Sequence, residues 1–100
     1  PDDLPFIAFD KKLSMLAGVY ESYKGVNRVS VIKKGSMLYL EIKDKLWEMN
    51  VPLIPESEKL EEYKFYIIEG GMKIPVEFVV DPSGKIDLYM ERHRLHKVRN

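Results

Sequence analysis

Two short motifs contain the residue types of nucleophilic serine chemistry, and they share one stretch of the chain. Ser30 and Lys33 have the S-x-x-K spacing of a nucleophilic serine and its lysine, and Lys33-Lys34-Gly35 is a loose K-x-G match. That chemistry needs the first pair at the start of a helix and the second motif on a separate strand. Val29 and Val31 instead predict a β-strand, in which residues three apart face opposite sides. We therefore expect no catalytic residue here and no enzymatic activity from this chain alone.

The histidines and acidic pairs give no pattern typical of a metal site. His93 and His96 are the two histidines, and their spacing places them on opposite faces of a strand. Without cysteine, and without a third ligand at a suitable interval, zinc binding is not expected. Asp2-Asp3 and Glu61-Glu62 lie in linker and loop composition, where solvated charge is usual. The sequence therefore predicts neither a metal nor another cofactor.

The C-terminal segment is locally basic, which raises the possibility of nucleic-acid binding. Its cations are Arg92, Arg94, Lys97 and Arg99, and aromatic side chains on neighbouring strands would offer a stacking platform. The whole chain, however, has 16 basic and 16 acidic residues, so no overall field attracts nucleic acid or an anionic membrane. Binding of single-stranded nucleic acid is accordingly the third hypothesis, and nucleic acid is not the expected partner.

The apolar pattern changes from a short helix to a long series of strands. Asp10 is predicted to cap a helix through Leu16, with residues 1–9 as a linker or the end of a preceding element and residues 10–100 as one barrel domain. A period of two then predicts strands at 18–23, 26–34, 37–43, 46–53, 63–69, 72–80, 85–91 and 93–99. Eight sequential strands with tight turns favour an all-β fold, an antiparallel up-and-down barrel that leaves no exposed edge.

The turns between these strands have specific residue signatures. Asp44-Lys45 predicts a tight turn, and Gly70-Gly71 supplies the positive φ angles of a type I′ hairpin. Residues 81–84 read Asp-Pro-Ser-Gly, in which Pro82 suits the first central position of a type I turn and Gly84 suits a left-handed position. These signatures support the predicted strand boundaries.

Strand alternation separates inward from outward apolar side chains. A barrel of this size can pack its interior or hold one small ligand. If a pocket exists, its predicted lining residues are Tyr20, Leu40, Trp47, Met49, Phe65 and Phe78. The predicted outward apolar side chains are Tyr39, Tyr66, Ile68, Val79 and Tyr89. Scattered apolar surface is normal, but tyrosine is favoured at interfaces, so Tyr39, Tyr66, Ile68 and Tyr89 are predicted contacts with another domain or subunit.

Composition gives further expectations about source and location. The chain has no Thr, no Gln and few Asn but many charged residues, a usage that suggests a hyperthermophilic source. Its apolar runs are far shorter than the roughly 20 residues of a membrane-spanning helix, so no membrane association is expected. It opens with Pro1 and has no charged-then-apolar leader, which predicts a cytoplasmic piece of a longer protein.

Several strand and turn segments carry a resemblance to a known family. These are Leu16–Glu21, Met37–Ile42, Pro52–Pro55, and Val76–Asp81 with Gly84-Lys85. Together they resemble the lipocalin-like C-terminal domain of serine β-lactamase and penicillin-binding-protein-like hydrolases, including archaeal serine peptidases that cleave peptides with D-residues.

This resemblance implies a non-catalytic accessory domain of a serine hydrolase, either a peptidase or an esterase. Such a domain packs on the catalytic domain or a neighbouring subunit, shapes access to the active site or supports assembly, and implies a homo-oligomer. No catalytic motif of the family can be placed on this chain. The alternative is a free-standing small barrel that binds an apolar small molecule, for which Gly18-Val19-Tyr20 is a weak match to the lipocalin glycine-x-aromatic signature.

Overall fold

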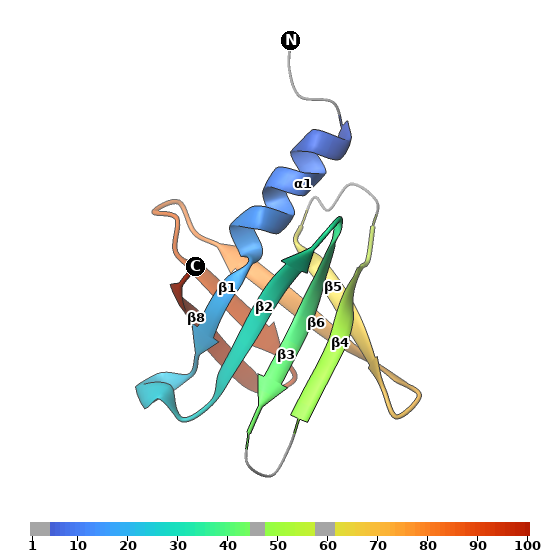
Figure 1. Ribbon diagram of the computed structural model, residues 1–100. Coiled ribbons are helices and arrows are strands. Elements are labelled where there is room, and N and C mark those ends of the chain that lie inside the picture. The colour runs from blue at the N-terminus through green and yellow to red at the C-terminus, as the bar shows by residue number, and fades with distance from the viewer. Residues whose placement is uncertain (1–4, 45–47, 58–61) are drawn as a thin grey trace.

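A closed barrel of eight antiparallel strands follows one N-terminal helix (Figure 1), as the sequence predicts. The computed structural model describes residues 5–44, 48–57 and 62–100. Each strand pairs with its neighbour in the chain, and β8 pairs with β1 to close the sheet. The elements are α1 (Pro5–Leu16), β1 (Gly18–Glu21), η1 (Tyr23–Gly25), β2 (Arg28–Lys34), β3 (Met37–Lys43), β4 (Glu48–Pro55), β5 (Lys64–Glu69), β6 (Met72–Val80), β7 (Ile86–Met90) and β8 (His93–Arg99).

The predicted bounds are correct for β3, β6 and β8, and the largest error is at the helix. α1 begins at Pro5 rather than at Asp10, so residues 5–9 belong to the same helix as Leu16. Proline suits the first helical turn because its fixed φ is helical and its missing N–H has no partner in that turn anyway. The first strand ends at Glu21 instead of residue 23, because a 3-10 turn follows in which Lys24 has a φ of 59°.

The hairpin turns have the predicted backbone conformation where the structure describes them. Gly70 and Gly71 have φ angles of 58° and 78°, the positive values of the predicted hairpin. In the turn after β6, the Gly84 N–H donates to the carbonyl of Asp81 at 3.0 Å. The Asp81 carboxylate accepts hydrogen bonds from Ser83 and from the Lys85 N–H, and these bonds hold the pKa of Asp81 below its ordinary value. The predicted turn at Asp44-Lys45 includes a residue outside the described part of the chain.

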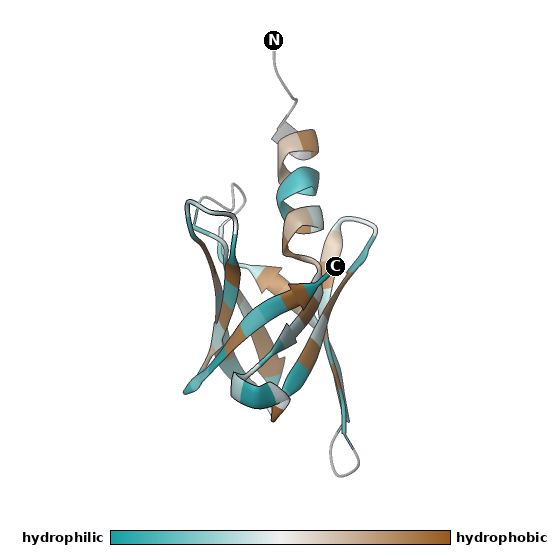
Figure 2. Cartoon of the chain, turned by 90° about the vertical axis from the view of Figure 1, so that its left-hand side faces the viewer, coloured by the Kyte–Doolittle hydropathy of each residue, from teal (hydrophilic) through white to brown (hydrophobic). Residues whose placement is uncertain are grey.

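The barrel interior is apolar and its exterior mostly polar. Hydrophobic and hydrophilic residues alternate along the strands, as the bands of colour in Figure 2 show. The buried residues are Leu13, Leu16, Tyr20, Val29, Val31, Leu38, Leu40, Ile42, Leu53, Phe65, Ile67, Val76, Phe78, Ile86, Leu88, Met90 and Leu95. Met49, Val51 and Ile74, which alternation also directs inward, pack against this core from partly buried positions. The described residues that alternation directs inward on β3, β4, β6 and β7 therefore face the core.

Helix α1 lies over one end of the barrel (Figures 1 and 2). Leu13 and Leu16 enter the core, and the Tyr20 hydroxyl donates to the Leu16 carbonyl at 2.7 Å. Asp10 forms a salt bridge with Lys33 at 2.8 Å. The Lys97 ammonium donates to the Met15 carbonyl at 2.8 Å. The helix is thus attached to β1, β2 and β8, and it lies at the end of the barrel where β8 finishes (Figure 1).

Candidate interaction surface

The residues predicted to line a pocket lie mainly in the packed core. Tyr20, Leu40, Phe65 and Phe78 are buried. The Phe78 ring is in edge-to-face contact with both Tyr20 and Phe65, with ring centroids 5.6 Å apart in each pair. Side chains therefore fill the interior at this level, and Phe78 brings the three aromatic residues together. Their role as ligand contacts stays a prediction.

The two other predicted lining residues are set apart from this cluster. Met49 is partly buried and packs against the core from β4. Trp47 lies outside the described residues. The sequence correctly places Met49 on the inner face, but alternation alone does not reveal that it lies toward one end of its strand.

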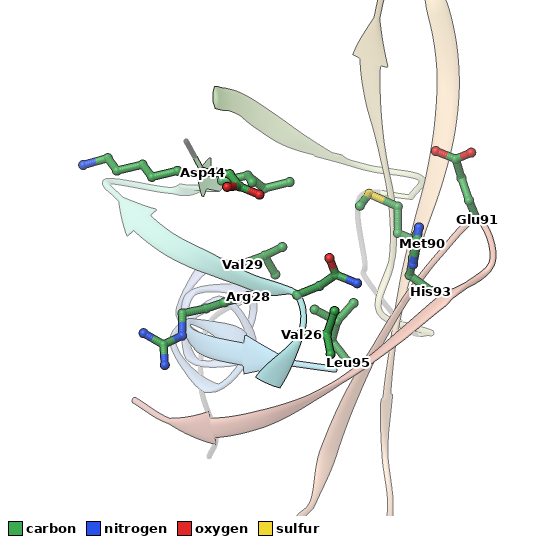
Figure 3. A pocket seen from close by; sticks show the side chains of 11 residues that line it. Val26, Arg28, Val29, Asp44, Met90, Glu91, His93 and Leu95 are labelled. Carbon is green, nitrogen blue, oxygen red and sulfur yellow. The ribbon is translucent and has the colours of Figure 1, made fainter. Parts of the chain in front are cut away.

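A pocket of about 290 Å³ opens at the end of the barrel opposite α1 (Figure 3). Four buried side chains form its floor: Val29, Ile42, Met90 and Leu95. Its rim combines charges of both signs with one apolar residue, and consists of Val26, Asn27, Arg28, Lys43, Asp44, Glu91 and His93. An apolar floor with a polar rim suits a small molecule that has an apolar body and a polar end.

Sequence reasoning missed the residues of this pocket. They come from β2, β3, β7 and β8 and from the connections beside them, so no single segment contains a recognisable pattern. Ile42 and Leu95 are assigned to the inner face by alternation, which was the available signal. That signal identifies inward residues but does not tell which of them lie at an open end and which lie at the packed centre.

Outward apolar side chains form a continuous stripe across five strands. The cross-strand register places Tyr39 between Ile32 and Pro52, and places Tyr66 between Ile54 and Pro75. Pro52 and Ile54 are both on the outer face of β4, so the two rows join there. We call this set the tyrosine stripe, and it consists of Ile32, Tyr39, Pro52, Ile54, Tyr66 and Pro75.

Lysines lie over both tyrosines of the stripe. The Lys34 ammonium is 5.3 Å from the centre of the Tyr39 ring, and that of Lys73 is 4.4 Å from the Tyr66 ring. Both are distances at which a cation is attracted to an aromatic face. Ile68 and Val79, on the same side of the sheet, are 47% and 45% exposed. The outward orientation predicted for Tyr39, Tyr66 and Ile68 is correct.

Tyr89 lies on β7 beside a network of charged side chains. Its ring centre is 5.8 Å from the guanidinium carbon of Arg94. Arg94 donates two hydrogen bonds to the Asp87 carboxylate, at 2.9 and 3.0 Å, and His96 Nδ1 lies 2.6 Å from the other carboxylate oxygen. Partial burial raises the pKa of Asp87, but the bonds from His96 and Arg94 outweigh that effect and leave the pKa below its ordinary value.

Among the described residues, four other exposed apolar side chains were missed by the sequence reasoning. Tyr23 is the first residue of the 3-10 turn and Val26 follows that turn, and each is 78% exposed. Met72 and Val98 are 67% and 49% exposed. Val98 lies two residues after outward His96 on β8, so alternation alone would have placed it on the outer face. Met72 lies two residues before inward Ile74, but it is at the end of its strand and extends beyond the core.

The serine and lysine of the S-x-x-K match are not in a catalytic arrangement. Lys33 donates to the Gly35 carbonyl at 2.9 Å and pairs with Asp10 of the helix. Ser30 lies between Val19 and Glu41 in the cross-strand register, on the other face of β2. Among the described residues, no three His, Asp or Glu side chains are grouped so that they could hold a metal ion. No helix in residues 5–44, 48–57 or 62–100 is long and apolar enough to cross a membrane.

Comparisons with known proteins connect this barrel to oligomer assembly. The family described as the Pab87 octamerisation domain matches residues 1–96. The octameric penicillin-binding protein homologue from Pyrococcus abyssi has a similar structure, with a TM-score of 0.80 and 33% sequence identity over 96% of this chain. The chain covers 21% of the length of that protein, and no curated protein matches it in sequence. With nearly its whole length matched, the chain belongs to the Pab87 octamerisation domain family.

Proposed function

We propose that this domain is a non-catalytic assembly domain that holds together copies of a larger serine-hydrolase-type protein. The observation that carries the proposal is the tyrosine stripe, an apolar band on the outside of a barrel whose family is described by octamerisation. Tyrosine is enriched at protein interfaces because its ring supplies contact area and its hydroxyl tolerates partial exposure. A second copy or the catalytic domain is the partner that would cover this band.

The parent polypeptide is proposed to be a peptidase or esterase of the penicillin-binding-protein type. Support comes from the penicillin-binding protein homologue that shares this fold at 33% identity and is about five times as long as the matched part. In such a protein, the lipocalin-like barrel would act by fixing where neighbouring catalytic domains lie, and so which substrates reach them. The nucleophile and its lysine are expected on the catalytic domain, since Lys33 is occupied by Asp10 here.

The test is the oligomeric mass of the full-length protein after changes in the stripe. Tyr39→Glu combined with Tyr66→Glu places two charges in the apolar band, and sedimentation velocity is expected to show smaller assemblies. Tyr23→Glu is the matched control, because Tyr23 is exposed and outside the stripe. Retention of the full assembly by the double variant, with its fold intact by circular dichroism, would refute the role proposed for the stripe.

The pocket opposite α1 supports a second candidate function, the binding of a small apolar molecule. Its volume of about 290 Å³ is near the lower end of ligand sites, and its floor is wholly apolar. Octanoate is a suitable probe because it has an apolar chain and one charged end. Saturable shifts of the Met90 methyl resonance that are lost in Leu95→Lys would support binding, whereas linear or absent shifts would exclude octanoate-like ligands.

A further inference from the structure

The barrel is closed, but its β4–β5 pairing is short. In the described residues, β4 and β5 pair through Ile54 with Tyr66 and Pro55 with Phe65. By contrast, β4 pairs with β3 over a longer segment, Glu48–Leu53. The two strands separate toward the end of the barrel away from α1 (Figure 1). The lower half of β4 therefore has a strand partner on one side and no described strand on the other.

We call the line along which β4 and β5 separate the seam. The direction of the backbone groups along it can be assigned. The Glu56 N–H donates to the Lys64 carbonyl at 2.9 Å, so Glu56 directs its backbone groups toward β5. Because these groups alternate along a strand, Asn50 and Pro52 also direct theirs toward β5. Pro52 has no N–H to donate, which agrees with the preference of proline for strand edges. On β5, Ile68 has the parity of Tyr66 and directs its N–H and carbonyl toward β4.

A groove lies between these two strand edges. Its volume is about 430 Å³, and it is lined by Glu48, Met49, Asn50, Val51, Ile68, Glu69 and Gly70. Met49 and Val51 face the core side, and Ile68 is 47% exposed. Glu48 and Glu69 are exposed, and neither carboxylate has a salt bridge to a residue that the structure describes. The groove thus combines an unpaired backbone edge, an apolar inner side and two negative charges.

We propose that this seam accepts an extended strand from a partner polypeptide, one in which lysine or arginine alternates with apolar side chains. The strand would pair with the β4 edge through its backbone, place its apolar side chains on the core side beside Met49 and Val51, and place its cations on the outer face beside Glu48. Glu69, the last residue of β5, adds negative charge at the end of the groove. Unpaired strand edges are known templates for such strand addition. The inference goes beyond the assembly role and does not depend on it.

Charge decides between a basic strand and the same edge of a second copy. Two copies of β4 paired with each other would bring four carboxylates, Glu48 and Glu69 from each, into one small region. Like charges on adjacent strands destabilise pairing. The negative groove is therefore matched by a positive segment, and the partner strand is a different sequence from Glu48–Leu53.

The experiment uses a capped peptide of alternating lysine and valine and follows amide hydrogen exchange by NMR. Binding is expected to slow exchange of the Asn50 and Ile68 amides by about tenfold or more at saturating peptide, since both become hydrogen-bonded to it or shielded from water. The same peptide with alternate backbone amides methylated is expected not to protect them. Protection of other strands only, or equal binding of the methylated peptide, would overturn the proposal.

Charge variants test the same site independently of backbone pairing. Glu48→Lys with Glu69→Lys is expected to weaken peptide binding about tenfold or more, from the loss and reversal of two charge contacts. Glu91→Lys is the control, since Glu91 is an exposed carboxylate outside the groove, and it should bind as the unaltered chain does. Unchanged affinity in the double variant would overturn the proposal, while oligomeric mass measured on the full-length protein reports on assembly separately.

Discussion

His96 Nδ1 lies 2.6 Å from Oδ1 of Asp87 on the outer face of the barrel, while Arg94 bonds to the other oxygen of the same carboxylate. One acidic side chain on β7 thus joins two basic side chains of β8. Because β8 also pairs with β1, this network reinforces the strand that closes the barrel. Its ionisation should consequently be linked to the stability of the whole fold.

Acid is predicted to weaken the fold through Asp87. The pKa of Asp87 is lower in the folded than in the unfolded chain, so its contribution is present above the unfolded value of about 4 and is lost as the pH falls through the folded value. Asp87→Asn is expected to lower the free energy of unfolding at pH 7 by about 1 kcal/mol, with a smaller difference at pH 2. Urea unfolding at both pH values measures this. Glu69→Gln is the control, and an equal cost of Asp87→Asn at both pH values would contradict the linkage.

Alkali is predicted to act through Tyr20. Burial, with a smaller contribution from Asp87, raises the pKa of the Tyr20 hydroxyl above its ordinary value. The unfolded chain therefore ionises first, and stability should fall as the pH rises above about 10. Tyr20→Phe removes this dependence and also leaves the buried Leu16 carbonyl without its bond, at a cost of about 1–2 kcal/mol at pH 7. Denaturant titrations at pH 7 and 10.5 test both effects, with exposed Tyr23→Phe expected to change neither.

Phe78 is predicted to be a major contributor to core stability. Its ring contacts both Tyr20 and Phe65, so Phe78→Ala removes two aromatic contacts and leaves a cavity. We expect a loss of about 3–5 kcal/mol, against under about 0.5 kcal/mol for Val79→Ala on the outer face of the same strand. If Phe78→Ala does not fold, Phe78→Leu provides the milder measurement. Equal costs at residues 78 and 79 would mean that the ring cluster is unimportant.

Gly18 is predicted to be needed for closure between β1 and β8. A Cβ atom at this position would lie 2.5 Å from the Arg99 carbonyl oxygen, and the backbone has a φ of 152°. Gly18→Ala should therefore cost about 2–4 kcal/mol and increase hydrogen exchange in β1 and β8. Gly35→Ala is the matched control, because its φ is also positive but no neighbour lies within 4 Å, so about 1–2 kcal/mol is expected. Similar losses in both variants would show that backbone conformation, and not the close approach, sets the cost.

The strand pattern was predictable because one face of every strand is buried. Leu38 and Leu40 lie on either side of outward Tyr39 in the chain, and a shift of one position would expose them. The same rule correctly assigned Tyr39 and Tyr66 to the outer face. Alternation reports which side of the sheet a residue faces and nothing about its neighbours. It therefore found Tyr39 and Tyr66 but not the apolar residues that join them into the tyrosine stripe.

The remaining features depend on how far strands pair and on where they end. The groove beside Asn50 exists because β4 and β5 separate. An alternating apolar pattern predicts a strand but not the length over which it pairs with its neighbour. The pocket opposite α1 is open because its floor residues, such as Met90, lie near strand ends. The start of α1 was misplaced because proline and aspartate are common both in linkers and in first helical turns.

The pairing of β1 with β8 also constrains how the protein is made. Val19 pairs with Arg99, so the sheet cannot close until the last strand has left the ribosome. Until then β1 offers an unpaired edge to other nascent chains, a state in which sheet proteins are prone to aggregate. Such non-local closure is also slow compared with hairpin formation. The growing chain would therefore benefit from a chaperone over that interval, and its yield should fall when β8 is delayed by rare codons.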